Sequence, residues 1–310
     1  MEIREAFGQA LLEVGKKHKD IVVVSCDLKG ATRTKYFFKA FPKRSFEVGI
    51  AEANGIGISA GLALAGYRPF ISSFGSFITG KNVEIRTSIA YNNAPVVIVG
   101  THGGLIGPDG TTQAGIQDIT TMRAMPSFLL LQPASPIETV AMVKYLAVSR
   151  EMAYLRIARN NVPEIYDKEY RFNLGKGYVI RDGNDITVIS SGPMVHNAIS
   201  AADMLRNDVG VRVINLPTLK PIDKEIILSS GVKTKAILVV EDHTVEGGLG
   251  SMVCEIVAEA GVPIPVWRHG IPDVFTESGT PEDLELKYNL DSVSIAKKVR
   301  ECLSLLPKRV

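Results

Sequence analysis

Short runs of β-branched and other apolar residues alternate with longer, helix-like segments along most of the chain. The runs lack polar alternation, which is typical of parallel strands buried on both faces of a sheet. They lie at residues 21–25, 68–73, 95–101, 128–133 and 153–158. The helical patterns between them lie at residues 2–18, 52–65, 77–91 and 136–149. Ser135, Pro136 and Glu138 favour a helix start at the last of these.

The pattern changes between residues 159 and 176, where the chain is polar and rich in turn-forming residues. A second alternating series follows. Its apolar runs lie at residues 186–192, 211–217, 236–242 and 265–270. Its helical patterns lie at residues 195–206, after the GGLG that ends at Gly250, and at residues 292–305. We therefore predict two doubly wound, three-layer α/β domains with mostly parallel sheets, formed by residues 1–168 and 169–310.

Composition and charge narrow the class of protein. The 310 residues carry 35 Lys and Arg against 33 Asp and Glu, so no excess of positive charge favours a nucleic-acid partner. The N-terminal MEIREAF lacks the features of a secretory leader, and the longest weakly polar stretch, residues 55–66, is too short to span a bilayer. Cys26, Cys254 and Cys302 match no disulfide framework or zinc motif. We expect a cytoplasmic protein that binds no nucleic acid, no membrane and no metal ion of its own.

One candidate chemical group is a carboxylate in an apolar helix. Glu52 begins a segment made mainly of Gly, Ala, Ile, Leu and Ser. An acid in the first turn is favoured by the helix dipole, which needs no functional explanation. Alternatively, Gly55, Gly57 and Gly61 allow a backbone or a flat ligand to approach, which would leave Glu52 in an apolar pocket. The residues alone leave both interpretations open.

A second candidate is the glycine-rich segment THGGLIGPDGTTQAG, residues 101–115, which directly follows a predicted strand. Open α/β sheets bind ligands at this edge, and His102, Asp109 and Gln113 supply polar groups there. A mobile surface loop is the alternative. The segment is not a phosphate loop, because it contains no GxxxxGK[ST].

Three smaller signals complete the candidate chemistry. Phe74 and Phe77 are spaced for a stacking platform, although such pairs are more often core residues. Arg156 and Arg159 end a strand and could clamp a phosphate or carboxylate, although isolated arginines are more often surface charges. The segment VEDHTVEGGLG, residues 240–250, predicts a turn from a strand into a helix, where an interface role is open. Its acidic residues and single histidine do not have the spacing of a metal-ligand motif.

Several motifs in a fixed order resemble the C-terminal half of transketolase, its pyrimidine-binding domain followed by its C-terminal domain. They are REAFGQAL, SCDLKGAT, GIAEANGI, FGSF, THGGLIGPDGTTQ, LRIAR, LPTLKPID and VVEDHTVEGGLG. The resemblance extends over essentially the whole chain. It implies a thiamine-diphosphate-dependent enzyme that transfers a two-carbon ketol unit from a ketose phosphate to an aldose phosphate.

The family's diphosphate-binding domain, with its GDG motif and later Asn, has no counterpart in this sequence. The resemblance therefore implies one subunit of a split transketolase that is inactive alone. Its partner would be the N-terminal subunit, which would hold most of the thiamine diphosphate and the Mg²⁺ or Ca²⁺. The family also implies a second copy of this chain, in an α2β2 heterotetramer, and phosphorylated sugars as substrates.

The resemblance assigns roles to single residues. Glu52 matches the catalytic glutamate that hydrogen-bonds the aminopyrimidine ring of the cofactor. Phe77 matches the aromatic residue that packs on this ring, Phe74 lies beside it, and Asp27 matches an acid near the thiazolium.

For the sugar, His102, Asp109 and Gln113 match residues that line the substrate channel, and His102 is also a catalytic candidate. Arg4 and Arg159 match the residues that bind the sugar phosphate, which suits guanidinium groups because each can donate two parallel hydrogen bonds.

Some positions depart from the family pattern. Gln113 stands where many transketolases have histidine. Ala31 replaces a phosphate-binding serine, with Thr32 as a possible substitute, and Pro108 replaces an acidic residue in a shortened loop. Gly80 follows the FGSF motif in place of a bulkier polar residue. These departures leave the thiamine chemistry intact but leave open whether the sugars are the usual pentose phosphates or a more specialised donor and acceptor.

Three alternative functions remain open at this point. Two are other thiamine enzymes: the E1 β subunit of a 2-oxo-acid dehydrogenase and a fragment of a deoxyxylulose-phosphate synthase. The third is a non-catalytic scaffold that kept the fold. His102, Arg4 and Arg159 favour phosphorylated sugars, and the retained Glu52 and Phe77 argue against a scaffold.

Overall fold

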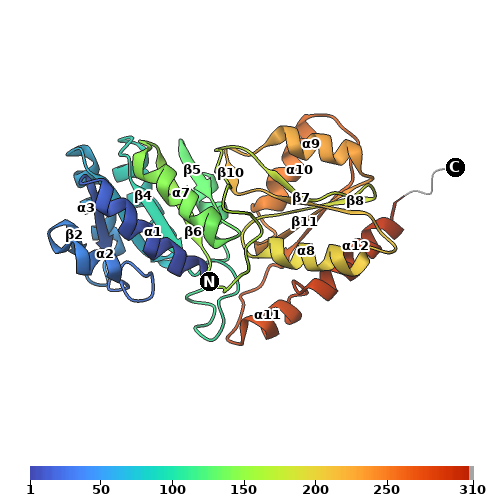
Figure 1. Ribbon diagram of the computed structural model, residues 1–310, viewed down its shortest axis with the longest axis horizontal. Coiled ribbons are helices and arrows are strands. Elements are labelled where there is room, and N and C mark those ends of the chain that lie inside the picture. The colour runs from blue at the N-terminus through green and yellow to red at the C-terminus, as the bar shows by residue number, and fades with distance from the viewer. Residues whose placement is uncertain (307–310) are drawn as a thin grey trace.

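The computed structural model describes residues 1–306 as two neighbouring β-sheets, each covered by helices on both faces (Figure 1). The first sheet has the strand order β10-β5-β6-β4-β3-β1-β2, and its neighbouring strands are parallel except for β10 and β5. Its strands are β1 (Ile21–Ser25), β2 (Ser45–Glu47), β3 (Arg68–Phe74), β4 (Val97–Thr101), β5 (Phe128–Leu131), β6 (Met152–Ile157) and β10 (Thr218–Lys220). The predicted mostly parallel α/β architecture is confirmed.

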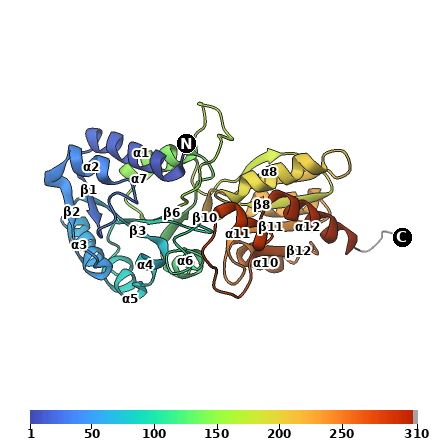
Figure 2. The ribbon, with the colours of Figure 1, turned by 90° about the horizontal axis from the view of Figure 1, so that it is seen from below.

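Helices cover both faces of this sheet because its central strands are apolar on both sides. Figure 2 shows α1 (Ile3–Lys17), α2 (Lys35–Ala40) and α7 (Pro136–Val148) on one face. On the other face lie α3 (Glu52–Leu64) and α6 (Asp118–Arg123), together with the shorter helices described below. A short 3-10 helix, η1 (Pro42–Arg44), precedes β2.

The second sheet has the order β12-β11-β8-β9-β7 and is parallel except for β7 and β9. Helices α8 and α12 lie on one face, and α9 and α10 on the other (Figure 1). The strands are β7 (Tyr178–Arg181), β8 (Ile186–Ser190), β9 (Val211–Asn215), β11 (Ile237–Thr244) and β12 (Val266–Ile271). The helices are α8 (Met194–Leu205), α9 (Lys224–Lys233), α10 (Leu249–Glu259), α11 (Pro281–Lys287) and α12 (Ser292–Ser304). No helix within residues 1–306 has the length and apolar character needed to cross a membrane.

Two features differ from the sequence-based expectation. The helix predicted at residues 77–91 is divided into α4 (Gly75–Thr79), α5 (Asn82–Glu84) and the π-helical η2 (Ile85–Ala90). The break falls at Gly80, whose low helix propensity favours an interruption. The other difference is β10, which comes from the second half of the chain but pairs antiparallel with β5 of the first sheet. Leu219 of this strand joins a core cluster that contains residues from both sheets.

The start of α7 is confirmed at the predicted position, and its third residue also connects the two sheets. The Ser135 hydroxyl accepts a hydrogen bond from the Glu138 N–H at 3.3 Å. The Glu138 carboxylate is fully buried and accepts hydrogen bonds from the Ala134 N–H (2.6 Å), the Tyr170 hydroxyl (2.8 Å) and the Asn215 amide (3.1 Å). Asn215 ends β9, so a buried carboxyl group joins the first sheet to the second.

We expect this buried carboxyl group to make the protein less stable as the pH rises. Burial raises the pKa of Glu138 from 4.5 to about 7 in the folded chain. Between these values the folded state binds more protons than the unfolded state, so the contribution is present below pH 4.5 and lost by about pH 7. The full difference corresponds to about 3 kcal/mol.

Urea unfolding at pH 5 and pH 7 checks this expectation. The Glu138→Gln variant should lose less stability over this interval than the unmodified chain. Part of the dependence should remain, because burial also raises the pKa of Glu241 to about 7. An equal loss of stability in both proteins would contradict the role given to Glu138.

Candidate active site

The candidate residues gather at the carboxyl edge of the first sheet, where open α/β sheets bind ligands. Asp27 follows β1, Phe74 ends β3, His102 follows β4 and Arg159 follows β6. Because β1, β3, β4 and β6 are consecutive parallel neighbours, their ends lie along one side of the sheet.

Glu52 is the first residue of α3 and is buried, with 7% of its surface exposed. The Ser73 hydroxyl donates a hydrogen bond to Glu52 Oε1 at 2.8 Å. Within residues 1–306, no hydrogen bond to Oε2 is present, so this oxygen is available to a ligand. The helix packs closely against its neighbours at Gly55, where an added Cβ would lie 3.2 Å from Cys26 Sγ and 3.0 Å from the Ile71 side chain. Glu52 is therefore a first-turn acid that is also buried, while Gly57 and Gly61 are exposed and a Cβ at either would meet nothing within 4 Å.

The rings of Phe74, Phe77 and His102 form a cluster that begins at the residue after Ser73. The rings of Phe74 and Phe77 are stacked with their centroids 5.2 Å apart, and Phe74 also lies 3.8 Å from the His102 ring. Phe74 is buried, whereas Phe77, in α4, keeps part of its surface exposed. Phe74 is thus a core residue, and Phe77 is the one of the two whose ring is partly exposed.

His102 is held in an unusual backbone conformation and is neutral. Its φ is +60°, its exposed fraction is 2%, and its Nδ1 lies 2.9 Å from the Thr101 hydroxyl. Burial, the largest cause, together with the positive charges of Arg4 and Arg159 lowers the pKa of His102 to about 3. At neutral pH the ring can therefore donate or accept a hydrogen bond but carries no charge.

The charges of Arg4 and Arg159 both lower the pKa of His102, whereas the charge of Glu2 raises it. Each guanidinium already has a carboxylate partner. Arg159 contacts Asp109 at 2.6 Å, and Arg4 contacts Glu2 at 3.0 Å and the Ala31 carbonyl at 3.2 Å. An anionic ligand at this place would compete with these carboxylates.

The remaining candidates lie at the border of this group. The Gln113 carbonyl accepts a hydrogen bond from the Ser76 hydroxyl at 3.0 Å, which ties the glycine-rich segment to α4. A cavity of about 130 Å³ lies between the two segments. Asp27 is exposed with a φ of +62°, and its N–H donates to Glu47 at 2.7 Å. No hydrogen bond or ion pair within residues 1–306 joins the Asp27 side chain to the other candidates.

Two sequence-based expectations need correction. Arg156 is not a surface charge: its side chain is fully buried and clamps two carboxylates of the chain itself, those of Asp118 and Asp242. Thr32, suggested as a substitute phosphate ligand, is also buried, and its hydroxyl is bonded to the Leu28 carbonyl at 3.0 Å and to Thr34 at 3.1 Å. No local pattern indicates the burial of Arg156, because its two partners lie 38 and 86 residues away in the chain.

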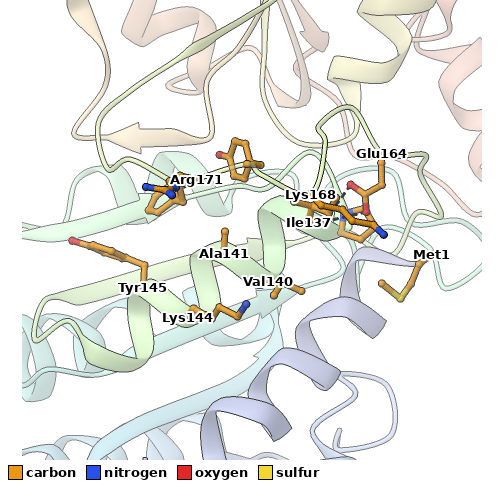
Figure 3. Close-up of a pocket in the computed structure, with 12 residues that line it drawn as sticks. Met1, Ile137, Val140, Ala141, Lys144, Tyr145, Glu164, Lys168 and Arg171 are labelled. Atoms are coloured by element: carbon orange, nitrogen blue, oxygen red, sulfur yellow. Dashed lines mark hydrogen bonds between the residues drawn. The ribbon is translucent and has the colours of Figure 1, made fainter. Parts of the chain in front are cut away.

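A larger cavity of about 510 Å³ lies elsewhere, between α7 and residues 164–172 (Figure 3). Glu164 borders it and accepts a hydrogen bond from the Ile137 N–H at 3.1 Å, and the Tyr145 and Phe172 rings meet edge to face. None of the candidate residues lines this cavity. Its size therefore says nothing about the site at the carboxyl edge.

Comparison with known proteins identifies the class of this α/β chain. Residues 1–164 match the family described as "Transketolase, pyrimidine binding domain", and residues 175–295 match "Transketolase, C-terminal domain". The chain belongs to the transketolase family, as the sequence motifs implied.

Several relatives match the chain from end to end. A protein of Methanocaldococcus jannaschii assigned as a transketolase C-terminal section is 39% identical over 304 residues, covering 96% of this chain and 95% of the relative. One subunit of the apulose-4-phosphate transketolase of Phocaeicola vulgatus is 35% identical, covering 96% of each. A solved structure titled "Split gene transketolase, inactive beta4 tetramer" is 40% identical with a TM-score of 0.91, covering 98% of this chain and 99% of that one.

A longer relative matches this chain over only part of its own length. The 1-deoxy-D-xylulose-5-phosphate synthase of Caldanaerobacter subterraneus is 36% identical, but the match covers only 48% of its length. The present chain therefore corresponds in extent to the separate C-terminal subunits of transketolases.

Proposed function

We propose that this chain is the C-terminal, catalytic subunit of a heteromeric transketolase. The complex would transfer a two-carbon ketol unit from a ketose phosphate to an aldose phosphate. The observation that carries this proposal is the environment of Glu52, a buried carboxylate with one oxygen held by Ser73 and, within residues 1–306, no hydrogen bond to the other. A chain that served only as a scaffold would have no need for a buried acid with an unused oxygen, because burying such a group costs free energy.

The residues present fit the pyrimidine half of thiamine diphosphate. A flat, polar heterocycle needs a hydrogen-bond partner at its edge and an apolar surface at its face, which Glu52 and Phe77 would supply. When bound, the cofactor supplies the carbon–carbon bond chemistry. Glu52 would hold a proton at a ring nitrogen, and Ser73 would keep the carboxyl group oriented through its 2.8 Å hydrogen bond.

The sugar would lie between this ring and the two arginines. Neutral His102 would hydrogen-bond a sugar oxygen, with Asp109 and Gln113 further along the same segment. Arg159 and Arg4 would bind the phosphate, displacing their present partners Asp109 and Glu2. Asp27 is the weakest of the proposed cofactor contacts, since its side chain is exposed at the end of the group.

The proposed partner is an N-terminal subunit that carries the GDG…N domain. It would hold most of the diphosphate and the Mg²⁺ or Ca²⁺, and two copies of each subunit would form an α2β2 complex in the cytoplasm. The related β4 tetramer, which is described as inactive, supports the dependence on a partner. The end-to-end match to one subunit of the apulose-4-phosphate enzyme supports the division into separate chains.

Ketol transfer from xylulose 5-phosphate to ribose 5-phosphate tests the proposal. The chain should be inactive alone and active when mixed with the candidate N-terminal subunit, thiamine diphosphate and magnesium. The matched control is the N-terminal subunit alone under the same conditions. Cofactor binding without transfer would point to other sugars or to an acyl donor. The absence of any cofactor-binding complex would contradict the proposal and favour a scaffold.

A further inference from the structure

The segment that bears His102, Asp109 and Gln113 is packed against the second sheet. We call residues 102–116 the substrate loop, a name that rests on the proposed function. Its apolar side chains are each at most 6% exposed and belong to the same core cluster as residues of β8, β9 and β11. They are Leu105, Ile106, Ala114 and Ile116. The loop is therefore not a free surface loop.

The base of the substrate loop is closed by backbone hydrogen bonds and held by Arg156. The Gly115 N–H donates to the His102 carbonyl, and the Gly104 N–H donates to the Gly115 carbonyl, both at 2.9 Å. The same Gly115 carbonyl accepts a 2.7 Å hydrogen bond from Arg156 Nη2. Asp118 orients this guanidinium by accepting from its Nε at 3.0 Å.

The other side of the guanidinium is held by a residue of the second sheet. Asp242, in β11, accepts from Arg156 Nη1 at 2.6 Å through Oδ1 and from Nη2 at 3.2 Å through its backbone carbonyl. Asp242 also lies directly against the loop: a Cβ at Gly104, whose φ is +83°, would be 2.1 Å from Asp242 Oδ2. Two residues further on, the Thr244 N–H donates to the Ile116 carbonyl at 2.9 Å.

We propose that Asp242 is a positioning residue for the substrate loop. Asp242 holds Arg156, which donates a hydrogen bond to the Gly115 carbonyl. That carbonyl also accepts from the Gly104 N–H, and the Gly115 N–H donates to the His102 carbonyl, so this series of hydrogen bonds reaches the backbone of His102. The second sheet would thus set the position of side chains that bind the sugar, although it contributes none of them. Removing the charge of Asp242 weakens the bond to Arg156 and leaves that cation buried with a single carboxylate partner, Asp118.

The neighbouring carboxylate supplies a matched control. Glu241 is equally buried, but its oxygens accept from the N–H groups of Leu249 and Gly250 at the start of α10, at 2.7 and 2.9 Å. Its loss should affect the stability of the second sheet and leave the substrate loop in place.

The test compares Asp242→Asn with Glu241→Gln by amide hydrogen exchange of the full chain. In Asp242→Asn, the amides of Gly104 and Gly115 should exchange roughly tenfold faster or more, and in Glu241→Gln they should not. This readout needs no activity, so it stands even if the proposed function fails. Equal exchange in the two variants would overturn the positioning role.

The reconstituted complex provides the kinetic arm. Asp242→Asn should raise KM for the phosphorylated sugars roughly tenfold and weaken thiamine diphosphate binding much less, because Glu52 is held by Ser73 outside the loop. An unchanged KM in an active complex would overturn the proposal. If Asp242→Asn does not fold, Asp242→Glu keeps the charge but displaces the carboxylate from Arg156, and the same two results are expected.

Discussion

Replacing Glu52 by Gln is expected to lower the turnover of the reconstituted complex by roughly 10²–10⁴-fold, the range for a lost acid–base group. Glutamine has nearly the same shape and can still accept the 2.8 Å hydrogen bond from Ser73. It cannot take up and release the proton that the proposed contact with the pyrimidine ring requires. The loss should therefore appear in turnover, with the fold and the assembly intact.

Steady-state ketol transfer in the reconstituted complex measures this effect, alongside thermal unfolding and cofactor binding. Glu13→Gln serves as the control, because Glu13 is an exposed acid of α1 that pairs with Lys16. This variant should retain the activity of the unmodified complex. Turnover of Glu52→Gln close to that of the control would remove Glu52 from the proposed chemistry.

The second large effect concerns the sugar phosphate. Replacing Arg159 by Ala should raise KM for phosphorylated sugars by roughly 10–150-fold, which corresponds to about 1.5–3 kcal/mol for a lost charge-assisted hydrogen bond. Unphosphorylated sugars should be affected much less. The variant also leaves Asp109 without the guanidinium that lies 2.6 Å away, so an uncompensated negative charge would further repel the phosphate.

The ratio of kcat/KM for phosphorylated and unphosphorylated donors separates this effect from a general loss of fit. Arg150→Ala is a matched control, since Arg150 is an exposed arginine that pairs with Asp20 at 3.1 Å. It should leave both substrates unaffected. If Arg159→Ala weakened both kinds of sugar equally, Arg159 would not be the phosphate-binding group.

The sequence predicted the central part of the fold because its signals are local. The apolar runs of β1, β4, β5, β6, β8, β9 and β11 and the start of α7 at Ser135 depend on neighbouring residues alone. The edge strands β2, β7 and β10 were not predicted. They are short, and pairing with a distant strand rather than a local pattern defines them.

The same distinction applies to the candidate site. Glu52 and the glycine-rich segment could be found because a lone acid among small residues and a cluster of glycines are visible in the sequence. The partners of these groups could not be found in this way. Ser73 meets Glu52 across 21 residues, and Asp242 meets Arg156 across 86. Only the folded chain brings such pairs together, and burial then decides whether a charge such as Arg156 is structural.

The placement of β10 has a consequence for dividing the chain. A fragment ending at residue 168, the boundary predicted from the sequence, would lack residues 218–220 and leave the β5 edge uncovered. That edge carries the apolar sequence Phe-Leu-Leu-Leu, and an exposed, apolar strand edge is a template for intermolecular pairing. The two halves are therefore not separable modules. In expression trials, the first half would need its borrowed strand supplied by a linker or by a second polypeptide to stay in solution.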